Sequence, residues 1–317
     1  MFDRGGGTGS RDPRNDPRFD GLELASRNCG AFLFNLETCI GSGSSLKPKV
    51  KAFVFRSPAP ALSALSRLPQ PIAALANNHS MDYGSAGLAT TIAALDSSGV
   101  LHAGAGRNSA EARAPALART PGGGMAILSR GFDGDPESFD GAAGPVIAPI
   151  DLGELTEDIA ACRAAAAAVV VILHWGVEYA TAYTAAEAEF ARKCVEAGAD
   201  MVIGTGPHVL RGVELYRGSL ICYSLGNLVF DDLGDDETST ALLARMRIEK
   251  DAGGKVRRSY AIAPLRTRRV EEGPRAPTRG QARRIVEALA LRSPDPSLLE
   301  HARFERLDGL YWFELGP

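Results

Sequence analysis

The sequence has few cysteines, no long apolar run and almost no excess of charge, and each absence excludes a class of protein. Its five cysteines are odd in number and form no C-x-x-C pair, which excludes a disulfide framework and a zinc ribbon. No apolar stretch reaches the roughly 18 residues of a membrane-spanning helix, and the first residues lack the apolar segment of a signal peptide. A net charge of −3 provides no basic field for nucleic acid. The sequence as written therefore predicts a cytoplasmic protein without a nucleic-acid partner.

Short apolar runs that end in polar residues are the main feature that the sequence does contain. The polar residues are Asn35 and Glu37 after AFLF, Asn77-Asn78-His79 after PIAAL, His174 after VVVIL, His208 after MVI, and Asn227 after LICYSL. Open α/β sheets build their active sites from functional groups at the carboxyl ends of buried strands. The pattern therefore predicts an α/β protein with a site at the strand ends.

Helical patterns alternate with these runs. Apolar residues recur at helical spacing over 85–98, and 151–168 forms a second, alanine-rich helical stretch. Thr184-x-x-Glu187 is a capping box ahead of a third helix, which ends at Gly198. Alternation of this kind supports the α/β class.

The pattern changes after about residue 238. Two β-rich stretches flank Gly253-Gly254 as in a hairpin, a helix is predicted near 278–291, and DGLYWFEL is typical of a last strand. We therefore expect a core over residues 1–240 and a C-terminal hairpin-helix-strand extension over 241–317, packed on the same domain.

Four segments carry a resemblance to a known family. They are Asn35-Leu36-Glu37, LANNHSMDYGSAGLATTIAALDSSGVLHAGAG, ILHWGVEY and GADMVIGTGPHVLRGVELYRGSLICYSLGNLVFD. In this order they resemble the family of the polyglutamate capsule synthesis protein CapA, in the calcineurin-like metallophosphatase superfamily. The resemblance implies a sandwich of two mixed β-sheets flanked by helices (α/β/β/α), with divalent metal ions held at strand ends.

The resemblance also implies metal ligands. Glu37 would be a bridging carboxylate, Asn78 and His174 would bind one metal ion, and His208 would bind the other. Mn, Zn, Fe and Ca remain open as the metal. Metal ions of this kind lower the pKa of a bound water and so supply a nucleophile.

Further residues would act on the substrate. By resemblance, His79 is the general acid and Asp82 orients it, while Asn35, Glu178 and Asn227 line the substrate cleft.

Two departures from the family pattern weaken the metal site. The family begins with a strand ending in Gly-Asp, followed by a segment like Met1-Phe2-Asp3-Arg4-Gly5, so the first strand and its Asp ligand are expected to be absent. Gly206 stands where the family has the first histidine of His-Pro-His. Each metal position thus loses a donor, and one metal ion rather than two is expected. We also expect Gly206→His to restore a ligand, provided that φ of Gly206 is negative.

Three functions remain open. The first is a metal-dependent hydrolase or transferase acting on a peptide or polyglutamate-type substrate in capsule biosynthesis. The second is a metal-assisted peptide epimerase of a natural-product pathway, and the third is a non-catalytic scaffold of a membrane-bound polyglutamate synthase complex. An upstream anchor or signal would move the protein to the cell envelope.

Overall fold

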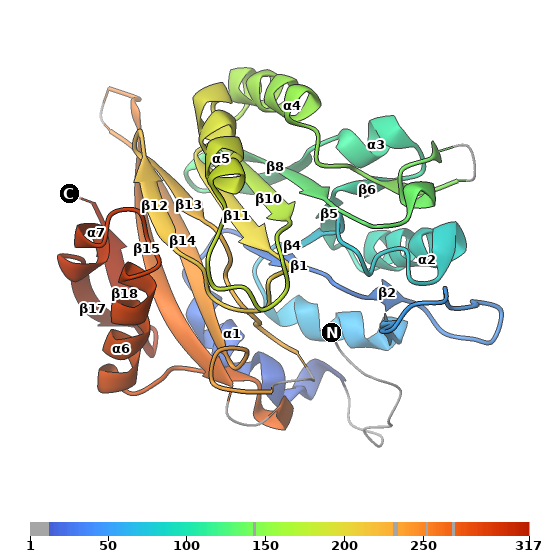
Figure 1. Cartoon of the computed structure of the whole chain (residues 1–317), viewed down its shortest axis with the longest axis horizontal. Coiled ribbons are helices and arrows are strands. Elements are labelled where there is room, and N and C mark those ends of the chain that lie inside the picture. The colour runs from blue at the N-terminus through green and yellow to red at the C-terminus, as the bar shows by residue number, and fades with distance from the viewer. Residues whose placement is uncertain (1–12, 142–143, 231–233, 252, 268–269, 317) are drawn as a thin grey trace.

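A six-stranded mixed sheet forms the centre of the molecule, in the order β12-β13-β11-β10-β8-β7 (Figure 1). Four inner strands run parallel: β8 (Gly123–Gly131), β10 (Ala168–His174), β11 (Met201–Thr205) and β13 (Ser219–Cys222). The edge strands β7 (Ala116–Thr120) and β12 (Val213–Tyr216) are antiparallel to their neighbours. Every residue of β10 is buried, as expected for a parallel strand covered on both faces.

The computed structural model describes residues 13–141, 144–230, 234–251, 253–267 and 270–316. The Met1–Gly5 segment, with Asp3, lies outside them. None of the helices in these ranges has the length and apolar composition that spanning a bilayer requires.

A second layer of strands faces the central sheet. It contains a parallel sheet of β1 (Phe32–Asn35), β4 (Pro71–Ala74) and β5 (Leu101–Ala103). It also contains an antiparallel sheet of β14 (Thr240–Lys250), β15 (Val256–Thr267), β18 (Leu310–Leu315) and β17 (Arg303–Leu307), with β16 (Pro274–Arg275) beside β15. Among the described strands β1 pairs with β4 alone, so its other edge is open. The short pairs are β2 (Cys39–Ile40) with β3 (Arg56–Ser57), and β6 (Ala105–Gly106) with β9 (Val146–Ile147).

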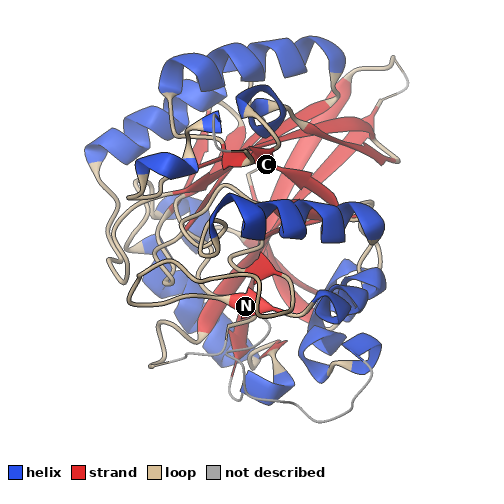
Figure 2. Ribbon diagram, turned by 90° about the vertical axis from the view of Figure 1, so that its right-hand side faces the viewer, coloured by secondary structure: helices blue, strands red, loops and turns tan. Residues whose placement is uncertain are grey.

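Helices cover both outer faces (Figure 2). On the central sheet, α4 (Leu152–Ala165) and α5 (Ala185–Ala197) bury Ile159 and Cys194 against Val169 and Val171 of β10. On the second layer lie α1 (Asp20–Ser26), the 3₁₀ helix Ala59–Arg67 and α2 (Gly84–Ser97). Alternate residues of β10 therefore serve two cores, because successive side chains of a strand point to opposite faces.

The remaining helices are short or C-terminal. They are α3 (Ser109–Arg113), α6 (Arg279–Ala290), α7 (Ser297–Glu300) and the 3₁₀ turns Pro13–Asn15, Pro17–Phe19, Pro136–Ser138 and Val270–Glu272. Side chains of α6 and α7 join the core between the two layers.

The predicted α/β/β/α sandwich is confirmed, and so are most of its elements. The helices expected over 85–98 and 151–168 are α2 and α4, and Thr184 caps α5 through a capping box, with Gly198 in the left-handed conformation at the other end of the helix. The C-terminal hairpin, helix and last strand are β14–β15, α6 and β18. Strand β17 was not expected, and the division at residue 240 stays a prediction.

Candidate metal centre

The side chain of Glu37 lies between two histidines at the carboxyl ends of the strands. Its Oε1 is 3.8 Å from Nε2 of His174, the last residue of β10, and 3.8 Å from Nε2 of His208, which follows β11. All three side chains are buried, and Glu37 Oε1 has no hydrogen-bond partner. Asn35 holds the other carboxylate oxygen, because its Nδ2 donates to Glu37 Oε2 at 3.0 Å.

The hydrogen bonds of His174 assign its proton to Nδ1. Its Nδ1 lies 3.2 Å from Thr205 Oγ1, whose hydroxyl donates to the carbonyl of Leu173 at 3.4 Å. The amide Nδ2 of Asn35, which can only donate, lies 3.5 Å from the same nitrogen. We assign the proton to Nδ1 because the Thr205 contact is the shorter of the two and the Thr205 hydroxyl has its own acceptor in Leu173. Burial lowers the pKa of His174, against the opposing effect of the Glu37 charge, so the ring is held neutral with a lone pair on Nε2.

His208 has the same tautomer for a similar reason. Its Nδ1 lies 2.8 Å from Asn227 Oδ1, and Asn227 Nδ2 donates to the carbonyl of Thr238 at 3.1 Å. That second bond fixes the orientation of the amide, so Oδ1 accepts from His208 Nδ1–H. The lone pair on Nε2 of His208 then faces Glu37 Oε1.

With both rings carrying a proton on Nδ1 alone, the two Nε2 atoms and Glu37 Oε1 are three acceptors that face one another. Buried polar groups in this state are costly unless a partner satisfies them, and a cation is the partner that suits all three. A second orphaned acceptor, Asn78 Oδ1, is buried beside the adjacent His79. Each 3.8 Å gap is shorter than the ~4.2 Å that two metal–ligand bonds of about 2.1 Å can span. The donor set thus fits a divalent metal ion.

Pair by pair, the distances suit a metal ion, but the three donors are not yet arranged around one point. Within the described ranges, no three His, Cys, Asp or Glu side chains are already placed to hold a metal ion together. Binding one ion through Glu37, His174 and His208 would therefore require these side chains to reorient.

His79 belongs to a second buried group. Its Nδ1 lies 2.8 Å from Asp82 Oδ2, which also accepts the backbone N–H of Phe55 at 2.6 Å. Lys51 Nζ donates to Asp82 Oδ1 at 2.9 Å and also to the carbonyl of Asn78. The ring of Phe55 stacks on His79 with centroids 4.0 Å apart. Asp82 thus orients the ring of His79 through Nδ1.

Several side chains of the site were assigned no role from the sequence. Asn77 joins the two groups, because its Nδ2 donates to Asn35 Oδ1 while its Oδ1 accepts from the N–H of His79. Asp133, two residues past the end of β8, is buried, and its charge raises the pKa of His174 against the larger effect of burial. Asn77 follows an apolar run, which was an available signal. Asp133 is separated from the nearest apolar run by SRGF, and Lys51 lies in a loop whose sequence has no such pattern.

The structure contradicts the expected negative φ at Gly206. Its φ is +107°, so a histidine there would be strained rather than a restored ligand, and its Cβ would lie 2.9 Å from the carbonyl oxygen of Trp175. Glu178 is exposed and lies outside the buried cluster, so its role at the substrate stays a prediction.

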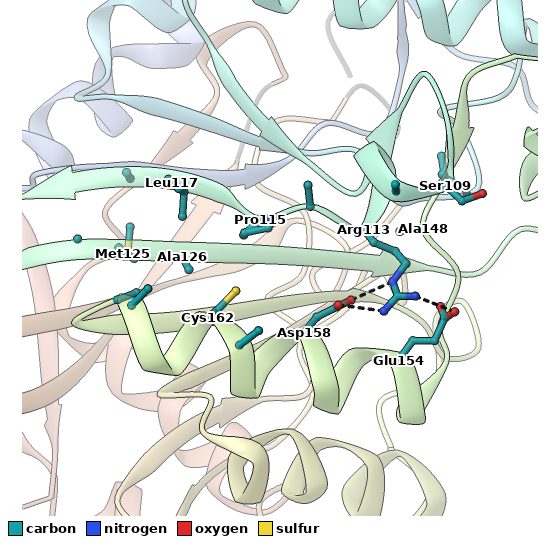
Figure 3. Close-up of a pocket in the computed structure, with 18 of the residues that line it drawn as sticks. Ser109, Arg113, Pro115, Leu117, Met125, Ala126, Ala148, Glu154, Asp158 and Cys162 are labelled. Atoms are coloured by element: carbon teal, nitrogen blue, oxygen red, sulfur yellow. Dashed lines mark hydrogen bonds and ion pairs between the residues drawn. The ribbon is translucent and has the colours of Figure 1, made fainter.

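A cavity of about 1090 Å³ lies elsewhere, between β7, β8 and α4 (Figure 3). Small apolar side chains line most of it, and Arg113 forms ion pairs with Glu154 and Asp158 at one end (Figure 3). None of the candidate metal donors lines this cavity, so the cavity is separate from the candidate metal centre.

Comparison with known proteins gives the family. The sequence model described as "Bacterial capsule synthesis protein PGA_cap" matches residues 1–232. The chain belongs to this family. As a PGA_cap protein it is 32% identical over 192 residues to the PGA biosynthesis protein CapA of Bacillus subtilis, covering 60% of this chain and 49% of that protein.

Other relatives agree. The "Probable polyglutamine synthesis accessory protein MT0602" of Mycobacterium tuberculosis is 32% identical over 256 residues, which cover 75% of this chain and 66% of that protein. The chain therefore spans between about half and two thirds of the length of these two relatives. A 5'-nucleotidase precursor from Thermus thermophilus has a TM-score of 0.33 at 14% identity, over 75% of this chain and 46% of its own, a similarity too low to support an argument.

Proposed function

We propose that this PGA_cap protein is a metal-dependent hydrolase or transferase acting on a peptide or polyglutamate-type substrate in capsule or polyglutamate synthesis. One observation carries the proposal: the unpartnered Glu37 Oε1 faces the lone pairs of His174 and His208. Glu37, Asn78, His174 and His208 would hold one divalent metal ion. The names of the relatives, which refer to PGA and polyglutamine synthesis, support the substrate class.

The bound metal ion would polarise a carbonyl group and activate a water molecule at neutral pH. The protein residues then have separate tasks. Asn35 orients the carboxylate of Glu37, while Thr205 and Asn227 keep the two imidazoles in the tautomer that leaves Nε2 free. Such outer partners are worth about 10–100-fold in metal affinity or activity.

His79 would deliver a proton to the leaving group from Nε2. Asp82 accepts Nδ1–H of His79 and so fixes the ring, and Lys51 offsets the charge of the fully buried carboxylate. The stacked ring of Phe55 excludes water from one face of the imidazole. General acid catalysis of this kind contributes about 10²–10⁴-fold.

Metal content tests the ligand set. Elemental analysis would compare the wild type with His174→Ala and His208→Ala, and with His301→Ala as a control at an exposed histidine. We expect the two site variants to lose the metal and the control to keep it. Equal metal content in all four proteins would refute the proposal.

Measuring turnover distinguishes an enzyme from a non-catalytic scaffold. His79→Ala should lower turnover of a γ-glutamyl peptide by roughly 100-fold or more while metal content stays unchanged. Polymer production in cells that is unimpaired by His79→Ala, at normal protein levels, would favour the scaffold of a synthase complex. Chiral analysis of the product would reveal the epimerase as inversion without cleavage.

A further inference from the structure

Three arginines near the C-terminus stack on two aromatic rings. The guanidinium carbons of Arg279 and Arg283 on α6 lie 5.3 and 5.4 Å from the ring centroid of Phe304 on β17. That of Arg306 lies 5.6 Å from the ring centroid of Tyr311 on β18, and the rings of Phe304 and Tyr311 stack with centroids 5.2 Å apart. We call these five residues the arginine array. The elements that carry it, α6, β17 and β18, lie together on one side of the molecule (Figure 1).

The strand register and the helix period produce this arrangement. Phe304 and Arg306 are two residues apart on β17, so their side chains point to the same face, and Arg306 pairs directly with Tyr311 of β18. Arg279 and Arg283 are four residues apart and therefore share one face of α6. Stacking occupies the flat face of a guanidinium group, whereas its N–H donors lie in the plane at the edge. The array thus holds its cations in place through contacts that do not consume these donors.

No carboxylate neutralises the charge of the array. Its three arginines are exposed, and none of them forms an ion pair within the part of the chain that the structure describes. Glu305 points to the opposite face of β17, where its Oε1 is 3.9 Å from Nη2 of Arg245. Glu287 follows Arg283 by one helical turn, yet the two are not paired. Unpaired guanidinium groups on one surface are suited to bind a ligand with several carboxylates.

Helix α6 connects the array with the candidate metal centre. Arg292, just past the end of α6, donates from Nη1 to the carbonyl of Leu210 at 2.8 Å, and Leu210 follows His208 by two residues. The 12 residues of α6 span about 18 Å. An extended chain covers that distance with about six residues. A polymer longer than this can therefore reach the metal centre and the array at the same time.

The surroundings of the array favour a soluble polycarboxylate over a membrane or a nucleic acid. Membrane-surface helices insert large apolar side chains, whereas Phe304 and Tyr311 are half-buried. Leu291, which is 85% exposed, lies at the opposite end of α6. A net charge of −3 would repel the dense phosphates of nucleic acid at long range. A flexible chain can instead present its carboxylates to three cations locally.

We infer that the arginine array is a second binding site for the polyglutamate-type polymer, which holds one part of the chain while another part lies at the metal centre. The choice of polymer rests on the proposed function. The family model matches residues 1–232, so the array lies outside the matched region and membership of the family does not imply this role.

Fluorescence anisotropy with a labelled glutamate polymer of about 20 residues tests the inference. The titrations are made in chelator and at low salt, because exposed charges are screened beyond about 10 Å at 0.1 M. They compare the wild type, the array variant Arg279→Gln/Arg283→Gln/Arg306→Gln and the control Arg27→Gln/Arg119→Gln/Arg247→Gln. The control removes three other exposed arginines that form no ion pair among the described residues, so both variants have the same net charge. Polyglutamine of equal length, anionic vesicles and duplex DNA are the alternative ligands.

The wild type and the control should bind the glutamate polymer about tenfold more tightly than the array variant, a change equivalent to about 1.4 kcal/mol. None of the three proteins should bind polyglutamine. Arg283→Gln alone should weaken binding about twofold, which provides the same reading should the triple variant fail to fold.

Equal affinity of the wild type and the array variant, or an equal loss in the control, would overturn the inference. So would tighter binding of the wild type to vesicles or to DNA than to the polymer, lost in the array variant. Elemental analysis of the same preparations tests the proposed function separately. Polymer binding by a wild type that takes up no metal would support the array and refute the metal centre.

Discussion

Replacing Glu37 by glutamine is expected to stabilise the metal-free protein and to abolish its response to metal. Glu37 Oε2 would be replaced by an amide oxygen that still accepts from Asn35 Nδ2. The new NH₂ group would then lie where Oε1 now faces the lone pairs of His174 and His208, 3.8 Å away. An acceptor that faces two acceptors is thus replaced by a donor that faces them.

The two effects can be given a size. An unsatisfied buried acceptor costs about 1–3 kcal/mol, so Glu37→Gln should raise the free energy of unfolding of the metal-free protein by about 1 kcal/mol. With an unfolding entropy of about 2.1 cal/mol/K per residue, that corresponds to about 1.5 °C in Tm for this chain of 317 residues. Metal at 100 times its Kd stabilises the wild type by about 2.7 kcal/mol, or about 4 °C, and should leave the variant unchanged.

Thermal unfolding followed by circular dichroism, in chelator and in a Mn²⁺ or Zn²⁺ series, gives both numbers. The order of the two Tm values should reverse on adding metal: the variant has the higher Tm in chelator, and the wild type has the higher Tm with metal. Glu178→Gln is the matched control, since it removes the same charge from an exposed position near the site. A metal-induced rise in the variant, or a lower Tm of the variant in chelator, would refute the reasoning.

Three further predictions concern the residues around the donors. Asn227→Leu removes the acceptor that fixes a histidine tautomer, so calorimetric titration should show metal binding about 10–100-fold weaker; an unchanged Kd would contradict this. Gly206→His should lower stability by about 1–2 kcal/mol and gain no metal affinity, because φ is +107° and the Cβ would approach Trp175; tighter binding would show that the backbone adapts. Lys51→Met should lower Tm by several degrees, with partial rescue by Lys51→Arg, because it leaves the fully buried Asp82 without its cation; an unaltered Tm would show that the ion pair is dispensable.

The parts of the site that lie at strand ends could be predicted from the sequence. Asn35 ends β1, His79 follows β4 and His174 ends β10, and each comes after an apolar run. Parallel strands place their carboxyl ends on one edge, and the two layers bring those edges together. Gly131 permits this approach, because a Cβ there would lie 2.0 Å from the carbonyl oxygen of Ala76.

Other parts follow from contacts that have no local signature. Lys51 reaches Asp82 across 31 residues from a loop without periodicity, and strand β17 takes its place only by pairing with β18. The sign of φ at Gly206 depends on how the chain leaves β11 beside Trp175. The identity of a residue does not predict such contacts. At Gly206 it leaves even the sign of φ open, because glycine adopts either sign at similar cost.

The state of a histidine is the hardest property to predict from sequence, and it decides what the site can do. His174 and His208 are recognisable by position, yet each becomes a metal donor at Nε2 only if its Nδ1 carries the proton. That proton is placed by Thr205, 31 residues from His174, and by Asn227, 19 residues from His208. Both partners are uncharged, so they fix the tautomer without adding a charge that would compete with Glu37 for a cation. A substitution that spares every donor but removes one of these acceptors should therefore weaken the centre almost as much as losing a ligand.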